Sequence, residues 1–159
     1  MQLRRVSDEL AEHRFFVRLG DDLRARLADC TNNVVYAADQ ELLREGAVAN
    51  SFFAIRSGRV AVGIRKPNQG LVVIETLHAG DLLGWSWLFP PHRWHFDAVA
   101  IEPVRAIELH AECIRSYIGA HPAAGFELVR GIAEVMEERL ESARLRLLDL
   151  YGSDDESRG

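Results

Sequence analysis

The spacing of apolar positions changes twice along the chain and divides it into three parts. Over residues 8–19 and 21–30, apolar side chains recur every three or four positions, with a break at Gly20. This spacing places them on one face of a helix, so two short amphipathic helices are predicted. The apolar stripe consists of Phe15, Phe16, Leu19, Leu23 and Leu27. We expect residues 1–32 to form a helical segment that covers one side of the part that follows.

Over residues 33–110 the apolar residues come in short runs separated by Gly, Pro and Asn. Gly and Asn adopt the positive φ angles of tight turns, and Pro lacks the backbone donor that a strand ladder needs. The runs cover residues 34–36, 41–43, 52–55, 59–64, 71–77, 96–101 and 104–109. Strands at this spacing, without helices between them, indicate an antiparallel barrel or jelly roll.

Helical spacing returns over residues 111–151, where a short helix to Ala120 and a long helix from residue 123 are predicted. Eight apolar residues of the long helix occupy successive a and d positions of a heptad repeat. They are Phe126, Val129, Ala133, Met136, Leu140, Ala143, Leu147 and Leu150. Such a narrow stripe is typical of a two-helix seam, so we expect a dimerisation helix that makes the protein a homodimer. The alternative, a helix folded back on its own barrel, is supported by three apolar residues outside the seam: Ile132, Leu145 and Leu148.

Composition and charge limit the classes of partner. The 159 residues suffice for one domain with an appendage, and a hydrophobic content of 48% suffices for a core. The net charge of -5 argues against a nucleic-acid surface, which draws on clustered Lys and Arg. Arg139, Arg144 and Arg146 are interleaved with acidic residues, so a solvated helix face is predicted there. Residues 152–159 contain no apolar side chain and are expected to be disordered.

The cysteines and the N-terminus indicate the compartment. Cys30 and Cys113 lie far apart and form neither a CxxC motif nor a Cys/His cluster. We predict two buried thiols in a reducing cytoplasm and no structural zinc. The N-terminus lacks the apolar core of a signal peptide, and no run approaches the ~18 apolar residues that a membrane span needs. A cytoplasmic location without a membrane contact is therefore expected.

The stretch over residues 80–100 concentrates aromatic side chains that are rare elsewhere. It contains all three Trp of the chain, two Phe, two adjacent Pro, two His and one Arg, although aromatics make up only 8% of the sequence. Predicted strands flank it on both sides. We interpret it as a pocket-forming insertion carried by a small barrel, and we expect the function to lie there.

Four short groups of residues carry a resemblance to a known family. They are LLREGA at 42–47, FFAI at 52–55, Ser57-Gly58 and GDLLG at 80–84. With the order of helices, Gly-punctuated strands and a long helix, the chain resembles the cyclic nucleotide-binding domain family, the sensory half of catabolite activator-type regulators, over about residues 15–150. The resemblance implies a mainly β fold with flanking α: an eight-stranded antiparallel jelly roll or barrel with N-terminal helices and a long C-terminal helix.

The insertion departs from the family pattern where the ligand would bind. The resemblance implies a Gly-Glu pair, whose Glu holds the ribose hydroxyl, and an Arg nine or ten residues later that neutralises the cyclic phosphate. This sequence keeps Gly84 but has Trp85 at the Glu position and Trp94 at the Arg position, with Arg93 one residue early. Indole has one donor and no acceptor, so Trp85 cannot replace a carboxylate against a diol. Losing one partner of a desolvated charge pair costs ~2–5 kcal/mol, so binding of ordinary cyclic AMP or cyclic GMP is not expected.

Three interpretations of the insertion follow. In the first, it binds a different nucleotide-like or anionic ligand, with the indole rings as stacking faces and an arginine as the charge. The candidate ligand-binding residues are Gly84, Trp85, Ser86, Trp87, Arg93, Trp94 and His95. In the second, the Trp side chains fill the pocket and the domain is a ligand-free scaffold. In the third, residues 85–91 form an exposed hydrophobic patch for a protein partner.

Neither catalysis nor direct DNA binding is indicated. His92 and His95 in the insertion, and His78 and His110 at strand ends, lack the HxH spacing of a metal-dependent cupin-type enzyme, which is the less favoured alternative. Ser86 lacks the second Gly of a nucleophile elbow. We predict no catalytic residue, no metal and no cofactor. No helix-turn-helix is expected within these residues, so any effect on DNA would pass through another protein. The chain is expected to be a regulatory or interaction module.

Overall fold

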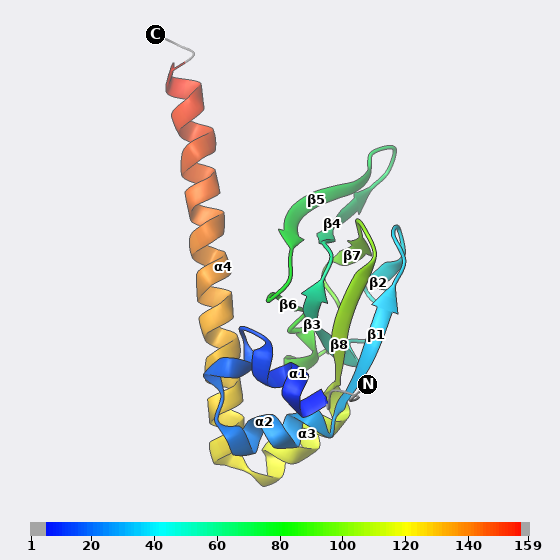
Figure 1. The fold of residues 1–159 in the computed structure, drawn as a ribbon. Helices are drawn as coiled ribbons and strands as arrows, with labels where there is room; N and C mark the ends of the chain where they lie inside the picture. The colour runs from blue at the N-terminus through cyan, green and yellow to red at the C-terminus, as the bar shows by residue number, and fades with distance from the viewer. Residues whose placement is uncertain (1–5, 157–159) are drawn as a thin grey trace.

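Two four-stranded antiparallel sheets form the body of the protein in the computed structural model, which describes residues 6–156 (Figure 1). The first sheet contains, in spatial order, β1 (Thr31–Tyr36), β8 (Val104–His110), β3 (Ser51–Ser57) and β6 (Leu82–Leu83). The second contains β2 (Glu41–Leu43), β7 (Asp97–Ala100), β4 (Val60–Lys66) and β5 (Gly70–Leu77). These strands and the helices around them confirm the predicted fold class, a mainly β antiparallel jelly roll with flanking helices.

The core lies between the two sheets. Phe52 and Ile55 of β3 and Ile107 of β8 are fully buried. Burying one such side chain stabilises the fold by ~1.5–3 kcal/mol. Gly58, after β3, has φ +90°, and a Cβ at this position would lie 2.4 Å from the carbonyl oxygen of Pro103. The turn between β3 and β4 therefore requires Gly, as expected from the sequence.

The N-terminal helices differ from the prediction at one point. The elements are α1 (Val6–Glu12), a 3-10 turn η1 (Phe16–Arg18) and α2 (Asp21–Ala28). The single helix predicted over residues 8–19 is thus interrupted at His13. The His13 side chain is buried, and its Nδ1 accepts the backbone N–H of Phe15 at 3.2 Å. Because this N–H is bonded to a side chain, it does not continue the helical ladder, and α1 ends.

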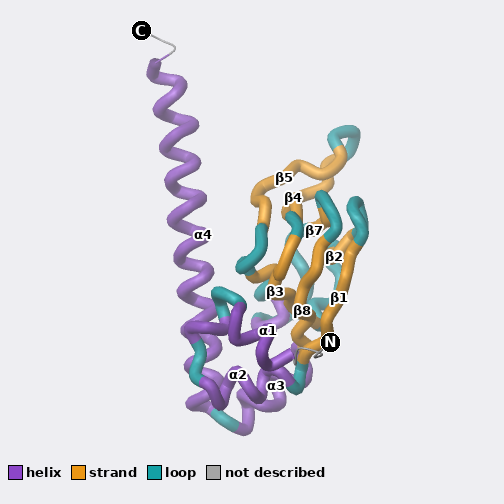
Figure 2. Tube along the Cα trace, in the orientation of Figure 1, coloured by secondary structure: helices purple, strands orange, loops and turns teal. Residues whose placement is uncertain are grey.

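Two helices follow β8, namely α3 (Ala111–Ala120) and α4 (Pro122–Glu156). Figures 1 and 2 show α1, α2 and α3 gathered at one end of the sheets, while α4 runs beside β5 and extends beyond it. Because α4 reaches Glu156, the prediction of disorder over residues 152–156 is wrong; residues 157–159 lie outside the described part. Gly152 costs the helix only ~1 kcal/mol relative to Ala, and no Pro follows to end it. Among residues 6–156, no helix has the length and apolar content that a membrane span requires.

Helix α4 contacts its own domain through one face and presents another face outward. Leu128 and Ile132 are buried against the domain. Most of the predicted seam faces away, since Phe126 is 70% exposed, Leu140 51% and Leu147 54%, but Met136 is partly buried against the core. The first half of the helix therefore packs on its own domain, in part as the alternative interpretation held. Of the three residues that supported that interpretation, Ile132 is buried, whereas Leu145 is 54% exposed and Leu148 66%.

The two cysteines form a disulfide, so the prediction of two buried thiols is wrong. Cys30 lies between α2 and β1, Cys113 lies in the first turn of α3, and their Cα atoms are 5.7 Å apart. Such a separation is usual for a disulfide. The pairing is hidden in the sequence by the 83 positions between the two residues. In the fold, β1 and β8 are neighbours, and Thr31 pairs with Leu109, which brings the adjoining segments together.

Candidate functional site

The candidate site is built on residues 84–95, called the cassette below. Gly84 follows β6 with φ +92°, and a 3-10 turn, η2 (Ser86–Leu88), comes next. A Cβ on Gly84 would lie 2.5 Å from Cζ3 of Trp94. Only Gly therefore allows the Trp94 indole, which is 7% exposed, to lie against this part of the backbone.

Backbone pairing decides which cassette side chains point inward. Trp94 donates its N–H to the carbonyl oxygen of Ala47 at 3.0 Å and accepts the N–H of Gly46 at 2.8 Å. Successive side chains of an extended segment alternate, so Arg93 points outward where Trp94 points inward. The exposed Arg93 donates from Nη1 to the carbonyl oxygen of Gly46 at 2.9 Å. The prediction that Arg93 supplies the charge inside the pocket does not agree with this position.

A cavity of about 150 Å³, called the cassette cavity, lies between the cassette, β5 and α4. Five of the seven predicted residues line it: Gly84, Trp85, Ser86, Trp94 and His95. The other lining residues are Leu43, Val62, Ile74, Glu75, Leu77, Leu83, Phe96 and Arg139. Trp87 and Arg93 are not among them. The walls are therefore mainly apolar and aromatic, with Glu75 and Arg139 as opposite charges.

Trp87 belongs to the core rather than to the cavity. It is fully buried, and its ring stacks on Phe52 with centroids 4.6 Å apart and planes 7° apart. Its carbonyl oxygen accepts a hydrogen bond from Nη1 of Arg115 on α3 at 2.7 Å. Trp87 thus anchors the cassette to β3 on one side and to α3 on the other.

The functional residue that sequence reasoning missed is Arg139 of α4. Its side chain is 17% exposed, and its Nε lies 3.4 Å from Oε1 of Glu75. The guanidinium carbon lies 4.9 Å from the centroid of the Trp85 ring, and Nη2 donates to the carbonyl oxygen of Leu82. Burial lowers the pKa of Arg139, and the nearby Glu75 opposes that shift. A guanidinium carries its charge throughout the range in which proteins are folded. Arg139 thus brings a buried positive charge from α4 to the wall of the cavity.

The prediction of a solvated face is wrong for Arg139. The sequence contains a weak signal of its burial, because Arg139 follows Ile132 by seven residues and Val135 by four. These spacings place all three on one helix face. Ile132 is buried and Val135 is partly buried against the core. Ile132 and Val135 therefore identify the face on which Arg139 lies.

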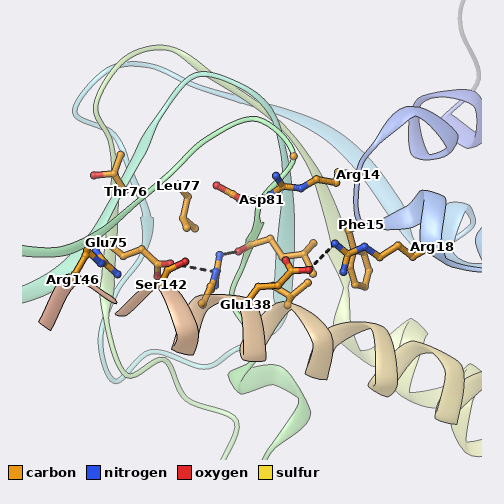
Figure 3. A pocket seen from close by; sticks show the side chains of 14 residues that line it. Arg14, Phe15, Arg18, Glu75, Thr76, Leu77, Asp81, Glu138, Ser142 and Arg146 are labelled. Atoms are coloured by element: carbon orange, nitrogen blue, oxygen red, sulfur yellow. Dashed lines mark hydrogen bonds and ion pairs between the residues drawn. The ribbon is translucent and has the colours of Figure 1, made fainter. Parts of the chain in front are cut away.

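Arg139 also borders a second cavity of about 350 Å³, called the outer cavity, between η1, β5 and α4 (Figure 3). Its charged side chains are paired across elements. Arg14 contacts Asp81 at 2.6 Å, and Arg18 contacts Glu138 at 2.7 Å. The residues shared with the cassette cavity are Glu75, Leu77 and Arg139. A movement of Arg139 therefore changes the walls of both cavities.

A family model described as "Cyclic nucleotide-binding domain" matches residues 33–121. The matched range contains both sheets except the first two residues of β1, and also the cassette and α3. The chain belongs to the cyclic nucleotide-binding domain family. The resemblance seen in the sequence is thereby confirmed, and the family is a regulatory rather than a catalytic one.

Curated relatives of this cyclic nucleotide-binding domain are larger proteins. The chain is 29% identical over 147 residues to glutaminase 2 of Bradyrhizobium diazoefficiens. This alignment covers 91% of the chain and 23% of that protein. It is 28% identical over 110 residues to a CRP-like cAMP-activated global transcriptional regulator of Mycobacterium tuberculosis. That alignment covers 69% of the chain and 47% of the regulator. The chain thus spans about a quarter of the first of these proteins and about half of the second.

Solved structures show the same fold. A cyclic nucleotide-binding domain from Methylobacillus flagellatus KT superimposes with a TM-score of 0.79 at 18% identity, covering 94% of this chain and 88% of that chain. The sensor domain of the transcriptional regulator DNR from Pseudomonas aeruginosa does so with a TM-score of 0.68 at 16% identity, covering 89% and 95%. The long helix is therefore included in a known arrangement of the fold.

The cassette cavity of this cyclic nucleotide-binding domain is small and lined by aromatic rings. The rings of Trp85 and Trp94, the residues expected to replace the family Glu and Arg, line the cavity. The remaining volume of about 150 Å³ is below the ~300–1,000 Å³ typical of small-molecule sites. A whole cyclic nucleotide would require at least one ring to move. Among the described residues, no three His, Cys, Asp or Glu side chains gather as a metal site would require.

Proposed function

We propose that this domain is a regulatory sensor for a small planar anion other than a standard cyclic nucleotide, and that it transmits occupancy of the cassette cavity to α4. The observation that carries the proposal is the position of Arg139. Its guanidinium is mostly buried, lies over the Trp85 ring and comes from the long helix rather than from the cassette. The positive charge at the cavity is therefore attached to the element that would transmit a signal.

The shape and chemistry of the cassette cavity support a planar anionic ligand. The indole rings of Trp85 and Trp94 offer flat apolar walls, against which an aromatic ring stacks favourably. The forked guanidinium of Arg139 suits a carboxylate or a phosphate. A cavity of about 150 Å³ accepts a molecule of the size of benzoate without displacing either ring. Gly84 and Ser86 also line the cavity and contribute polar backbone groups.

Competition for Arg139 supplies the coupling. In the described state Arg139 joins α4 to β5 through Glu75 and to β6 through the carbonyl oxygen of Leu82. An anion in the cavity would compete with Glu75 for the guanidinium. The contact between α4 and β5 would then weaken, and α4 would be free to change its tilt. A ligand shifts such an equilibrium only by its different affinity for the two arrangements, and here the difference lies in the contacts of Arg139.

The outward face of α4 is the surface that we propose to be read by other molecules. The outer stripe, defined as Phe126, Val129, Leu140, Leu147 and Leu150, contains five side chains that are each at least 40% exposed. We propose that it forms a homodimer seam and that the output reaches a protein partner rather than DNA directly. Matches to part of a glutaminase and part of a transcriptional regulator support a regulatory role toward another activity. A cytoplasmic location remains part of this proposal.

The test is ligand-induced thermal stabilisation, followed by calorimetric titration. Benzoate, AMP, cyclic AMP and cyclic GMP serve as probes for the wild-type protein and for Arg139→Met. Arg146→Met is the matched control, because Arg146 lies on the same helix but does not line the cassette cavity. We expect benzoate to raise the Tm of the wild type and of Arg146→Met, and not of Arg139→Met. The cyclic nucleotides should leave the Tm unchanged.

The competing function is a ligand-free scaffold whose Trp rings fill the former pocket. The close approach of Trp94 to Gly84 favours it. The scaffold predicts that none of the probes raises the Tm and that Arg139→Met alters stability alone. Micromolar binding of cyclic AMP would contradict both functions, because it would show that the ancestral ligand still fits beside Trp85.

A further inference from the structure

The Cys30–Cys113 disulfide connects two elements that meet at one end of the jelly roll. Cys30 stands between α2 and β1, and its carbonyl oxygen accepts the N–H of His110 at 2.8 Å. Cys113 lies three residues after His110, in α3. The start of α3 is also held by a hydrogen bond, because Ala111 donates its N–H to the carbonyl oxygen of Asn50 at 2.8 Å. The disulfide therefore fixes the first turn of α3 against the start of β1.

The two sulfur-bearing residues differ in exposure. Cys30 is 5% exposed and belongs to the hydrophobic core, whereas Cys113 is exposed. Thiol–disulfide exchange requires a thiolate to reach one of the two sulfur atoms, and the rate depends on that access. An external thiol can therefore approach from the Cys113 side while Cys30 is shielded by the core.

Helix α3 also contacts the cassette through a hydrogen bond. Arg115 is two residues after Cys113, and its Nη1 donates to the carbonyl oxygen of Trp87 in η2 at 2.7 Å. The neighbouring residues Trp85 and Ser86 line the cassette cavity. The disulfide is thus connected to the candidate ligand site through the first turn of α3, the Arg115 side chain and η2.

We propose that the Cys30–Cys113 pair is a redox modification site that exchanges with a dithiol, and that its oxidation state controls the mobility of the cassette. The thiolate of the dithiol attacks the sulfur of Cys113, forms a mixed disulfide and releases the Cys30 thiolate. The second thiol of the reagent then displaces the Cys113 thiolate and closes the oxidised reagent. Two electrons pass to the protein, both released thiolates take up protons, and the reverse reaction restores the disulfide.

Release of this bond loosens the anchor of the cassette. In the oxidised protein, the covalent link holds the first turn of α3, which holds Arg115 in reach of Trp87. In the reduced protein, the first turn of α3 loses that constraint, and the hydrogen bond to the Trp87 carbonyl forms for a smaller fraction of the time. Disulfides that reductants can reach in a reducing compartment act as redox sensors more often than as permanent braces. The effect on ligand sensing rests on the proposed function, but the effect on the cassette does not.

The experiment compares the oxidised and dithiothreitol-reduced forms of the full chain. Thiol titration in denaturant, after removal of dithiothreitol, should count no free thiol before reduction and two after it. Hydrogen exchange read by mass spectrometry should follow the amides of Leu88, Phe89 and His92, which are bonded within the cassette. We expect reduction to accelerate their exchange roughly tenfold, as local opening becomes easier. No ligand is needed for either measurement.

Two variants separate this mechanism from a purely structural disulfide. Cys113→Ser changes an exposed position. The cassette amides of this variant should exchange as fast as those of the reduced wild type, and dithiothreitol should not change their rate. Arg115→Met should exchange fast already in the oxidised state, with little added by reduction. Two free thiols in air-oxidised protein would overturn the proposal. So would a reduction that lowers the Tm while cassette exchange stays unchanged, whatever the outcome of the ligand tests.

Discussion

At the scale of single residues, the structure depends on polar groups placed at positions that the apolar pattern does not reveal. His13 is an example, since its ring is 6% exposed and joins the N-terminal segment to the barrel. Nδ1 accepts the N–H of Phe15, so the neutral ring carries its proton on Nε2, which donates to the carbonyl oxygen of Ile55 at 3.1 Å. Burial lowers the pKa of His13 from 6.5 to about 4.

The buried imidazole predicts an acid-sensitive stability. The unfolded chain takes up a proton on this ring below about pH 6.5, while the folded chain resists protonation until about pH 4. Stability contributed by the neutral ring is therefore present above pH 6.5 and is lost as the pH falls toward 4. Between pH 7 and pH 5 the loss from this group should be about 2 kcal/mol.

Urea unfolding at the two pH values measures this loss. His13→Gln should be less stable at pH 7 and should show a smaller fall between pH 7 and pH 5 than the wild type. His121→Gln, at an exposed ring, is the control and should keep the wild-type fall. An equal fall in all three proteins would contradict the assignment to His13.

The residue scale also shows where sequence reasoning about the site succeeds and where it does not. The sequence predicts that Trp85 and Trp94 lie at the pocket, and both rings line the cavity. The direction of the Arg93 side chain cannot be predicted from the sequence, because it depends on the backbone pairing of Trp94 with Gly46 and Ala47. Arg139 is 45 positions from Trp94 in sequence, and only the docking of α4 brings it to the cavity.

At the scale of elements, strand positions follow from the apolar runs and short elements do not. The seven predicted runs correspond to seven strands, but β6 contains only Leu82 and Leu83 and is too short to form a run. The N-terminal limit of β1 is also missed, since it begins at Thr31 in a polar stretch. Its pairing with β8, which no local pattern encodes, makes residues 31–33 extended.

Helix α4 gives a matched pair of substitutions that tests its docking. Leu128 is fully buried against the domain, while Leu140 is 51% exposed on the outer stripe of the same helix. Leu128→Ala should lower the free energy of unfolding by ~2–5 kcal/mol, because it leaves a cavity. Leu140→Ala should change it by less than ~0.5 kcal/mol in the monomer.

Chemical unfolding at a protein concentration low enough to favour the monomer provides the measurement. A similar cost for the two substitutions would mean that the outer face of α4 is covered within the same chain. It would contradict the separation of the helix into an inner and an outer face.

At the scale of the whole molecule, the sequence predicts the jelly roll and its flanking helices but not the ties between distant parts. The disulfide and the ion pair of Arg139 with Glu75 both join segments that are more than 60 positions apart. Such pairings follow from the order of strands in the sheets rather than from local composition. They could be found from the sequence only after the fold was known.

The outer stripe of α4 predicts self-association. Sedimentation velocity should show a species of twice the 17.9 kDa chain mass at high concentration. Leu140→Glu combined with Leu147→Glu should weaken the dimer at least ~tenfold, because two buried charges would lack partners. Glu141→Lys, at an exposed position beside Leu140, is the control and should leave the dimer intact. A wild-type monomer at every concentration would contradict the seam.

The length of α4 beyond Arg139 has a mechanical consequence. Glu156 lies seventeen positions after Arg139, which at 1.5 Å per residue is an arm of about 26 Å. If the helix swings by about 10° when the guanidinium changes partner, the far end is displaced by about 4–5 Å, given that arm length. A rearrangement no wider than one side chain would thus become a shift as large as the gap between neighbouring β-strands, and another protein could detect it.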